Sequence, residues 1–162
     1  SHDRCSVVEV MGHTAGYLAL NAGIAVGATS ILVPEVPYDF EKDVVGRMRR
    51  TQKTGKKHFI IIVAEGIGGT MEMAETIERE TGVESRTTVL GHVQRGGSPT
   101  VRDRVLASEM GHYAVKLLMQ DIGNRVVAYK KDSIVDYDIY EALNMKKSFD
   151  MEIYKLAHEI SI

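Results

Sequence analysis

The sequence of 162 residues has little or none of several features that mark whole classes of protein. Its one cysteine, Cys5, cannot form an internal disulfide or build a thiolate metal site, so we expect a reducing, cytoplasmic compartment. The longest apolar run, 59–64, is far shorter than the roughly 20 residues that span a bilayer, which predicts no membrane segment. No basic and then apolar leader opens the sequence, and no secretory signal is expected.

Neither sign of charge is in large excess, because 20 Lys and Arg stand against 22 Asp and Glu, for a formal net charge of −2. This balance argues against a protein that coats nucleic acid. Hydrophobic residues at 44% and charged residues at 26% are typical of a soluble globular protein, and the length fits about one domain. The sequence starts at Ser1 without an initiator methionine, so we expect a piece of a longer protein.

Four β-rich segments alternate with helical patterns from residue 5 to residue 119. The expected strands are 5–10, 30–33, 58–64 and 85–90, and the expected helices are 15–25, 40–53, 71–81 and 101–119. We expect Ser98 to cap the last of these helices, with Pro99 at its first position. The alternation is the signature of right-handed βαβ units, so the predicted fold class is α/β with a parallel sheet. Short strands at 125–129 and 133–137 and helices at 139–144 and 151–160 should complete the chain.

Three of the expected strand-to-helix turns are rich in glycine: 11–16, 65–69 and 91–97. Each follows the C-terminal end of a strand, so all three should lie at one edge of the sheet, where open parallel sheets bind ligands. Free N–H groups at helix N-termini favour phosphate or carboxylate there. For any one turn taken alone, a simple need for glycine in the turn remains the alternative.

Side chains in and beside these turns indicate an anionic ligand rich in hydroxyl groups. Arg95 and Arg86 carry planar guanidinium groups that suit phosphate oxygens. His92 can donate to an oxyanion, and Glu65 can accept from sugar hydroxyls, so a phosphorylated sugar meets the description. Plain alternatives stay open: His92 as a structural histidine, Arg86 as an exposed edge residue, and Arg4 as part of a fraying terminus.

A second basic cluster, 53–58, precedes a strand and therefore belongs to the opposite edge of the sheet. One interpretation is a solvated helix end, where lysines complement the helix dipole. The other is a separate anion site, which its distance from the first edge would make regulatory.

Two standard nucleotide motifs are missing. The dinucleotide fingerprint that begins at Gly66 needs glycine at the place of Met71, and a phosphate loop ending at Gly55 needs glycine at the place of Arg50. No aspartate stands in a glycine turn, where it could act as a base beside metal-bound phosphates. The sequence therefore supports neither a dehydrogenase nor a P-loop kinase.

Five segments together resemble bacterial ATP-dependent 6-phosphofructokinase: 6–12, 34–36, 55–58, 63–66 and 89–99, of which the last is the most specific. The similarity runs from end to end of this chain but covers only the C-terminal half of that enzyme. It implies an incomplete parallel-sheet, three-layer substrate domain of the phosphofructokinase fold. The absent half carries the ATP loop and the catalytic base, so no catalytic residue and no metal ligand is expected here.

The resemblance implies substrate-binding roles position by position. The positions that match residues holding fructose 6-phosphate are Met11, Gly12, Glu65, His92 and Arg95. His13 is added to this set, although the family often has arginine at its position. Two further positions, Arg4 and Arg86, match arginines that reach the 6-phosphate across a subunit interface.

The resemblance also implies an effector site for ADP or phosphoenolpyruvate. Its matching positions are Gly27, Lys56, Lys57 and His58. Thr29 stands where well-studied allosteric members have glutamate, and Thr54 replaces a lysine. Both departures bear on which effector the site would take.

The same resemblance divides the chain and describes the whole enzyme. Residues 1–93 would form the fructose 6-phosphate domain, 94–144 a segment of the ATP domain, and 145–162 a helical return. The full-length enzyme would be a cytoplasmic, allosteric homotetramer of glycolysis that uses ATP and Mg²⁺ to phosphorylate the 1-hydroxyl of fructose 6-phosphate. This chain alone would be inactive, and helix 101–119 would expose apolar surface that favours association.

No nucleic-acid or membrane partner is expected. Two alternative functions stay open: a pyrophosphate-dependent homologue, and a non-catalytic module that binds sugar phosphates or other anions.

Overall fold

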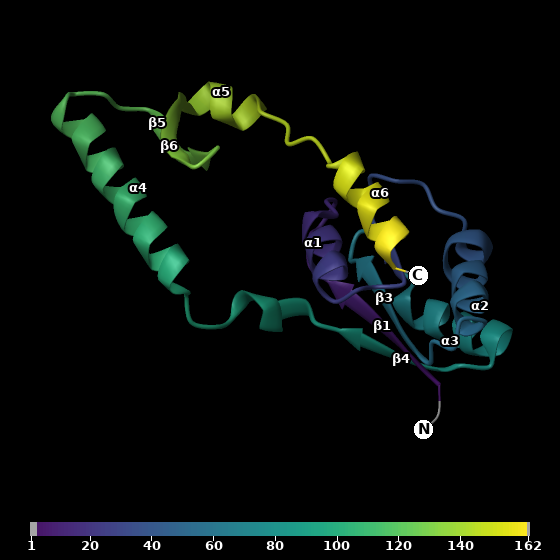
Figure 1. The fold of residues 1–162 in the computed structure, drawn as a ribbon. Coiled ribbons are helices and arrows are strands. Elements are labelled where there is room, and N and C mark those ends of the chain that lie inside the picture. The colour runs from purple at the N-terminus through teal and green to yellow at the C-terminus, as the bar shows by residue number, and fades with distance from the viewer. Residues whose placement is uncertain (1–2, 162) are drawn as a thin grey trace. The chain divides into compact units, whose positions relative to one another are not determined.

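Four parallel strands form one sheet in the order β2-β3-β1-β4 (Figure 1). In a computed structural model that describes residues 3–161, the strands are β1 (Arg4–Val10), β2 (Ser30–Leu32), β3 (His58–Ala64) and β4 (Glu84–Val89). β1 and β3 pair along their whole length, from Arg4 opposite His58 to Val10 opposite Ala64. The predicted α/β class with a parallel sheet is confirmed.

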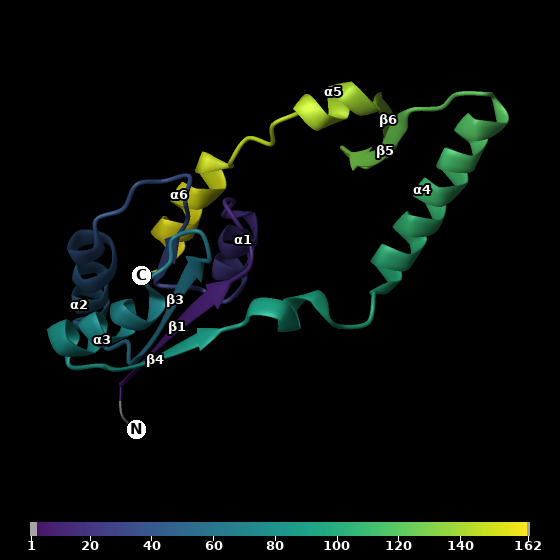
Figure 2. The same cartoon turned by 180° about the vertical axis from the view of Figure 1, so that it is seen from behind.

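Helices cover both faces of this sheet and make three layers. Helices α1 (Tyr17–Ala25) and α6 (Met151–Ile160) lie on one face, and α2 (Gly46–Gln52) and α3 (Thr70–Thr81) lie on the other (Figure 2). The sheet and these helices belong to one compact unit, Ser1–Gly96 with Phe149–Ile162, while Gly97–Ser148 forms a second unit. The assignment of residues 1–93 to a fructose 6-phosphate domain, of 94–144 to an ATP domain and of 145–162 to a helical return stays a prediction.

Alternate residues of β3 enter two separate apolar cores. Phe59, Ile61 and Val63 belong to the core under α2 and α3, whereas Ile62 and Ala64 belong to the core under α1 and α6. All of them are at most 4% exposed. Burying each large apolar side chain contributes about 1.5–3 kcal/mol. The apolar run therefore forms a central strand that is buried on both faces, as predicted.

The segment expected as one helix over 40–53 contains two helical geometries. It begins as a π-helical turn, η1 (Glu41–Val45), and continues as α2. The wider turn leaves two successive residues, Val44 and Val45, both fully buried. A π turn accommodates an extra residue at such a place, and its geometry does not show in an apolar pattern of period 3.6.

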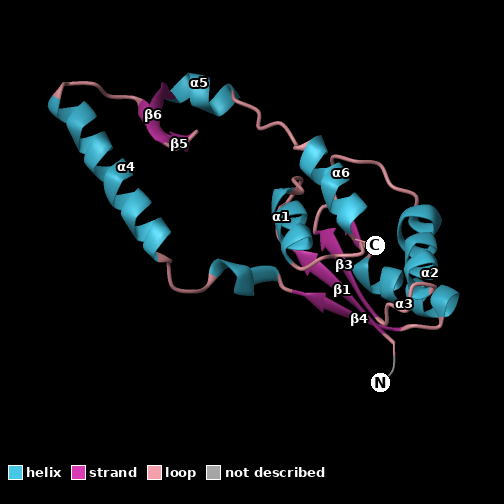
Figure 3. Cartoon of the chain, viewed as in Figure 1, coloured by secondary structure: helices cyan, strands magenta, loops and turns pink. Residues whose placement is uncertain are grey.

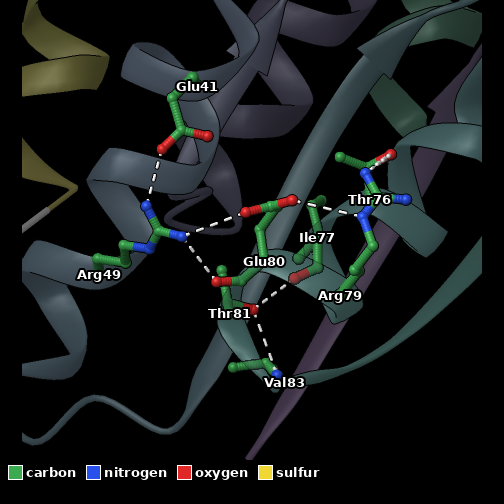
Figure 4. Close-up of polar contacts among 8 residues, drawn as sticks. All are labelled: Glu41, Arg49, Thr76, Ile77, Arg79, Glu80, Thr81 and Val83. Carbon is green, nitrogen blue, oxygen red and sulfur yellow. Dashed lines mark hydrogen bonds and ion pairs between the residues drawn. The ribbon is translucent and has the colours of Figure 1, made fainter.

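Arg49 ties α2 to the end of α3 (Figure 4). Its guanidinium donates to the Glu41 carboxylate at 2.8 Å and to the backbone oxygen of Glu80 at 2.8 Å. Beside this contact α3 ends at Gly82, whose φ of 70° lies in the left-handed region that glycine tolerates. The two helices on this face are thus joined by polar contacts at the surface and by apolar packing below.

The second unit consists of α4 (Val101–Met119), the antiparallel pair β5 (Arg125–Lys130) and β6 (Ser133–Asp138), and α5 (Ile139–Asn144) (Figure 3). The hairpin turn uses Lys131 and Asp132, which have positive φ angles of 49° and 57°. Two successive residues of this kind form the turn that matches the natural twist of paired strands. The two strands and the helix predicted after 119 are confirmed.

Thr100 caps α4, so the prediction of Ser98 as the cap and Pro99 as the first helical residue is wrong. The Thr100 hydroxyl accepts from the Asp103 backbone N–H at 3.2 Å, and the Asp103 carboxylate accepts from the Thr100 N–H at 2.8 Å. This reciprocal capping box needs an acid three residues after the cap. From Ser98 that position is Val101, which cannot reciprocate.

The surface of α4 carries several large apolar side chains. Val101 is 79% exposed, Leu118 66% and Met119 80%. Such a helix favours association with another apolar surface. In the part of the chain that the structure describes, no helix is both long enough and apolar enough to cross a membrane.

Candidate ligand-binding site

The carboxylate of Glu65 joins the turn after β3 to the turn after β1. It accepts hydrogen bonds from the backbone N–H of Gly12, at 3.2 Å, and from that of His13. Because Val10 and Ala64 pair at the ends of the two strands, the turns begin side by side. Both bonds end on Oε1 of the carboxylate. Three of the predicted substrate-binding residues are therefore in direct contact.

Gln94 brings the third glycine turn to the first. The backbone N–H of Met11 donates to Oε1 of Gln94 at 2.7 Å, and the N–H of Leu90 donates to the oxygen of Glu9 at 3.1 Å. These bonds hold the 3₁₀ turn η2 (Gly91–Arg95) against the end of β1. The three turns thus meet at one edge of the sheet, as their position after parallel strands predicts.

Two glycines make this close approach possible. A Cβ at Gly12 would collide with the carbonyl oxygen of Ala15, and a Cβ at Gly66 would collide with the carbonyl oxygen of His13. His13 itself adopts a φ of 51°, in a region where residues other than glycine are uncommon. Any larger residue at Gly12 or Gly66 would force the first two turns to move.

His92 and Arg95 lie on η2 with exposed side chains. Gln94 stands between them, so its bond to Met11 carries both residues to the edge where Glu65 lies. Five hollows in the described part of the chain are lined by other residues. The structure therefore joins His92 and Arg95 to Glu65 through the backbone of η2, and not through direct side-chain contacts.

Two residues that the sequence analysis did not single out help to build this edge. Gln94 is one, and the other is Glu35, whose two carboxylate oxygens accept from the N–H of Gly16 at 2.8 and 3.0 Å. This contact fixes the residue that precedes α1. Both missed residues follow strands or lie in a glycine turn at the same edge, which was the signal available for them.

Arg4 and Arg86 lie away from Glu65, near the starts of β1 and β4. Both approach the Glu84 carboxylate, with Nη2 of Arg86 at 2.6 Å from one oxygen and Nε of Arg4 at 3.9 Å from the other. The two arginine side chains stay 75% and 64% exposed. The three residues line a small hollow of about 140 Å³. The role expected of these arginines at a neighbouring subunit's ligand stays a prediction.

The basic cluster also lies at the edge opposite Glu65. Lys56, Lys57 and His58 lead into β3, and Nζ of Lys56 donates to the backbone oxygen of Ser161 at 3.4 Å. Gly27, in the turn before β2, has a φ of 62°. Their position at this edge agrees with their place before the strands, and their effector role stays a prediction.

Metal ligands are not gathered anywhere in the described part of the chain. Among residues 3–161 no three or more His, Cys, Asp and Glu side chains come together as a group that could hold a metal ion. The residues present therefore do not fit a protein-ligated site for the Mg²⁺ that the resemblance assigns to the full-length enzyme.

The three-layer unit and its joined turns define an α/β protein whose glycine turns meet at the carboxyl edge of a parallel sheet. The family model described as "Phosphofructokinase" matches residues 1–118. This chain belongs to the phosphofructokinase family, and the resemblance stated from its motifs is confirmed.

Individual relatives agree with the family. The chain is 51% identical over 162 residues to proteins named ATP-dependent 6-phosphofructokinase from Bacillus subtilis and Bacillus velezensis. Each alignment covers 100% of this chain and 50% of the relative. The chain therefore spans about half the length of the curated relatives it matches. Among solved structures, phosphofructokinase from Saccharomyces cerevisiae matches with a TM-score of 0.81 at 32% identity, over 99% of this chain and 23% of that one. Phosphofructokinase from Pichia pastoris in the T-state matches with a TM-score of 0.81 at 35% identity, over 88% of this chain and 17% of that one.

Proposed function

We propose that this chain is the fructose 6-phosphate-binding half of an ATP-dependent 6-phosphofructokinase. The observation that carries the proposal is the junction of three glycine turns through Glu65 and Gln94 at one edge of the sheet. The names of the relatives, all given as ATP-dependent, favour ATP over pyrophosphate as the phosphoryl donor.

The proposed site recognises the sugar by position and charge. Oε1 of Glu65 is taken by two backbone N–H groups, so Oε2 is the oxygen that would accept from a sugar hydroxyl. His92 and Arg95 would donate to anionic oxygens of the sugar phosphate from η2. Met11, Gly12 and His13 would shape the floor of the site with their backbone.

The reaction of the full-length enzyme would form a bond between the 1-hydroxyl oxygen and the γ-phosphorus of ATP. The bond between that phosphorus and the β–γ bridging oxygen breaks, and ADP leaves. The hydroxyl proton goes to a base that this chain does not supply. This chain's own part is to hold the acceptor hydroxyl in place, which removes much of the entropic cost of reaction.

Two further sites are part of the proposal. Arg4 and Arg86, exposed at the opposite edge, would reach the 6-phosphate in a neighbouring subunit of a homotetramer. The cluster of Lys56, Lys57 and His58 with Gly27 would contribute to an effector site for ADP or phosphoenolpyruvate. Its support is the concentration of positive charge beside the C-terminal segment.

Calorimetric titration of the purified chain with fructose 6-phosphate tests the main site. The chain should bind the sugar phosphate, and Arg95→Ala should weaken binding about tenfold or more, since a charge-assisted hydrogen bond is lost. Arg102→Ala, an exposed arginine on α4, is the matched control and should bind like the parent chain. Equal affinity of the Arg95→Ala variant and the parent would contradict the assignment. Measurable kinase turnover by this chain alone would contradict the assignment of the base to the absent half.

A further inference from the structure

The turn that follows β2 reaches the same edge of the sheet as the three glycine turns. It contains Pro34 and Glu35, which come directly after Val33. β2 is not a neighbour of β1, because β3 lies between them in the sheet. A contact between the turn after β2 and the turn 11–16 therefore crosses the end of β3.

Gly66, in the turn after β3, lies against residues of both other turns. A Cβ at Gly66 would lie 3.1 Å from Cγ of Pro34 and 2.4 Å from the backbone oxygen of His13. Neither neighbour leaves room for a larger side chain. The turn after β2 is thus a fourth member of the assembly that contains Glu65.

Glu35 holds the last residue of the turn 11–16. Both of its carboxylate oxygens accept from the backbone N–H of Gly16, at 2.8 and 3.0 Å. Gly16 is buried, and a Cβ there would lie 2.4 Å from Cβ of Val33 and 2.7 Å from Oε2 of Glu35. Since a buried N–H without an acceptor is costly, loss of this carboxylate would favour a shifted turn.

The same carboxylate stands at the N-terminus of α1. Gly16 precedes the helix and has no side chain to cap it, and the first turn of α1 carries no acidic residue. A carboxylate is favourable at this end because it meets the positive end of the helix dipole. α1 has only nine residues, and helices this short depend on contacts from outside. Glu35 therefore supplies, from the turn after β2, the acceptor that α1 lacks.

Hydrogen bonds hold the turn 11–16 at both ends and close it in the middle. Glu65 accepts from the N–H groups of Gly12 and His13. The Ala15 N–H donates to the Gly12 oxygen at 2.8 Å, which closes the turn just before Gly16. Because the turn is closed, a shift of Gly16 would move Gly12 and His13 relative to Glu65.

We propose that Glu35 is a positioning residue of the sugar phosphate site, which fixes Gly16 so that Gly12 and His13 meet the Glu65 carboxylate before the ligand binds. This inference rests on the proposed function and adds the turn after β2 to the site. Glu35 acts through Gly16 and has no need to touch the sugar. An edge that is ordered in advance binds its ligand more tightly, because less conformational freedom is lost on binding.

The test begins with amide hydrogen exchange, followed by NMR on the purified chain without ligand. In Glu35→Ala the N–H groups of Gly12 and His13 should exchange about tenfold faster or more, because their bonds to Glu65 open more often. Glu35→Gln keeps an oxygen that accepts from Gly16, so it should stay within about threefold of the parent. Glu75→Ala, an exposed glutamate on α3, is the matched control and should change neither amide.

Calorimetric titration with fructose 6-phosphate is the second measurement. Glu35→Ala should raise the dissociation constant about threefold to tenfold, whereas Glu35→Gln and Glu75→Ala should bind like the parent. Amide signals of β3 at their parental positions show that each variant is folded.

A purely structural role of Glu35 at α1 gives a different result. Faster exchange confined to Gly16 and α1, with parental rates at Gly12 and His13, would overturn the inference. Glu35→Gln that exchanges as fast as Glu35→Ala would overturn it as well, since an acceptor would then be present without holding the turn. Parental affinity for the sugar phosphate in Glu35→Ala would remove Glu35 from the site. Failure of the parent chain to bind fructose 6-phosphate would instead overturn the proposed function, and the exchange rates would still decide whether Glu35 holds the turn.

Discussion

Oε1 of Gln94 accepts the backbone N–H of Met11 at 2.7 Å, across 83 positions of sequence. This one contact connects the turn that carries His92 and Arg95 to the end of β1. Neither Gln94 nor Met11 needs to touch the sugar for the contact to matter, because it sets where η2 stands. Gln94 is in this sense a positioning residue for the proposed site.

Gln94→Ala should weaken binding of fructose 6-phosphate about tenfold while the protein stays folded, since the loss of one hydrogen bond costs about 0.5–1.5 kcal/mol of stability. Calorimetric titration and urea unfolding measure the two effects separately. Gln120→Ala, in the second unit, is the control and should change neither quantity. An unaltered affinity for the sugar phosphate in Gln94→Ala would show that η2 keeps its place without this bond.

Glu65 has a structural role and a proposed binding role, and substitution can separate the two. Glu65→Gln keeps an oxygen acceptor for the N–H groups of Gly12 and His13 but puts an NH₂ group in place of the other oxygen. We expect near-parental stability in urea and a loss of sugar phosphate binding of about tenfold or more. Glu65→Ala should lose binding and also about 1–3 kcal/mol of stability, because both N–H groups lose their partner. Parental binding by Glu65→Gln would remove Glu65 from the proposed site.

Met48 tests the core between the sheet and α2. It is fully buried in the same core as Ile77, whereas Met71 is 67% exposed on α3. Met48→Ala should lower the free energy of unfolding by about 2–5 kcal/mol, through lost burial and a new cavity. Met71→Ala should change it by less than about 0.5 kcal/mol. Urea denaturation of both variants is the measurement, and similar values for the two would contradict this packing.

The capping box of α4 gives a prediction with a built-in comparison. Thr100→Ala should destabilise the second unit by about 0.5–2 kcal/mol, because the Asp103 N–H loses its acceptor. Ser98→Ala should have no measurable effect, since the structure assigns the cap to Thr100. Hydrogen exchange of the amides in the first turn of α4 reports on the helix directly. Faster exchange in Ser98→Ala than in Thr100→Ala would restore the prediction made from the sequence.

Burial of Cys5 makes the stability of the folded chain depend on pH in the alkaline range. Burial of its side chain raises the pKa of the thiol from 9.0 to about 12. The unfolded chain ionises more readily, so this thiol contributes stability that is complete below about pH 9 and is lost as the pH rises toward 12. Alkylation by iodoacetamide at about pH 8 should be very slow in the folded chain and fast in urea. Rapid alkylation under native conditions would contradict the burial of Cys5.

The sequence predicts this fold where one physical signal dominates. The apolar run of β3 could only be a strand buried on both faces, and the glycine turns that follow parallel strands had to share an edge. The sequence does not reveal Gln94 or Glu35, because their partners are backbone N–H groups brought near only by the folded sheet. The π turn before α2 was missed for a related reason, since it buries both Val44 and Val45, which only the folded chain shows.

The first unit is assembled from two stretches of chain that are separated by residues 97–148. Phe149, Tyr154 and Ala157 pack into the core that contains Leu20 and Ile31, and the Tyr154 hydroxyl donates to the Ile31 oxygen at 3.2 Å. During translation, therefore, the layer under α6 stays open until the ribosome has made the whole intervening segment. Nascent chains stalled before Phe149 should present this bare flank of the sheet to chaperones, which makes ribosome display of truncated products a direct probe of how the molecule is built in the cell.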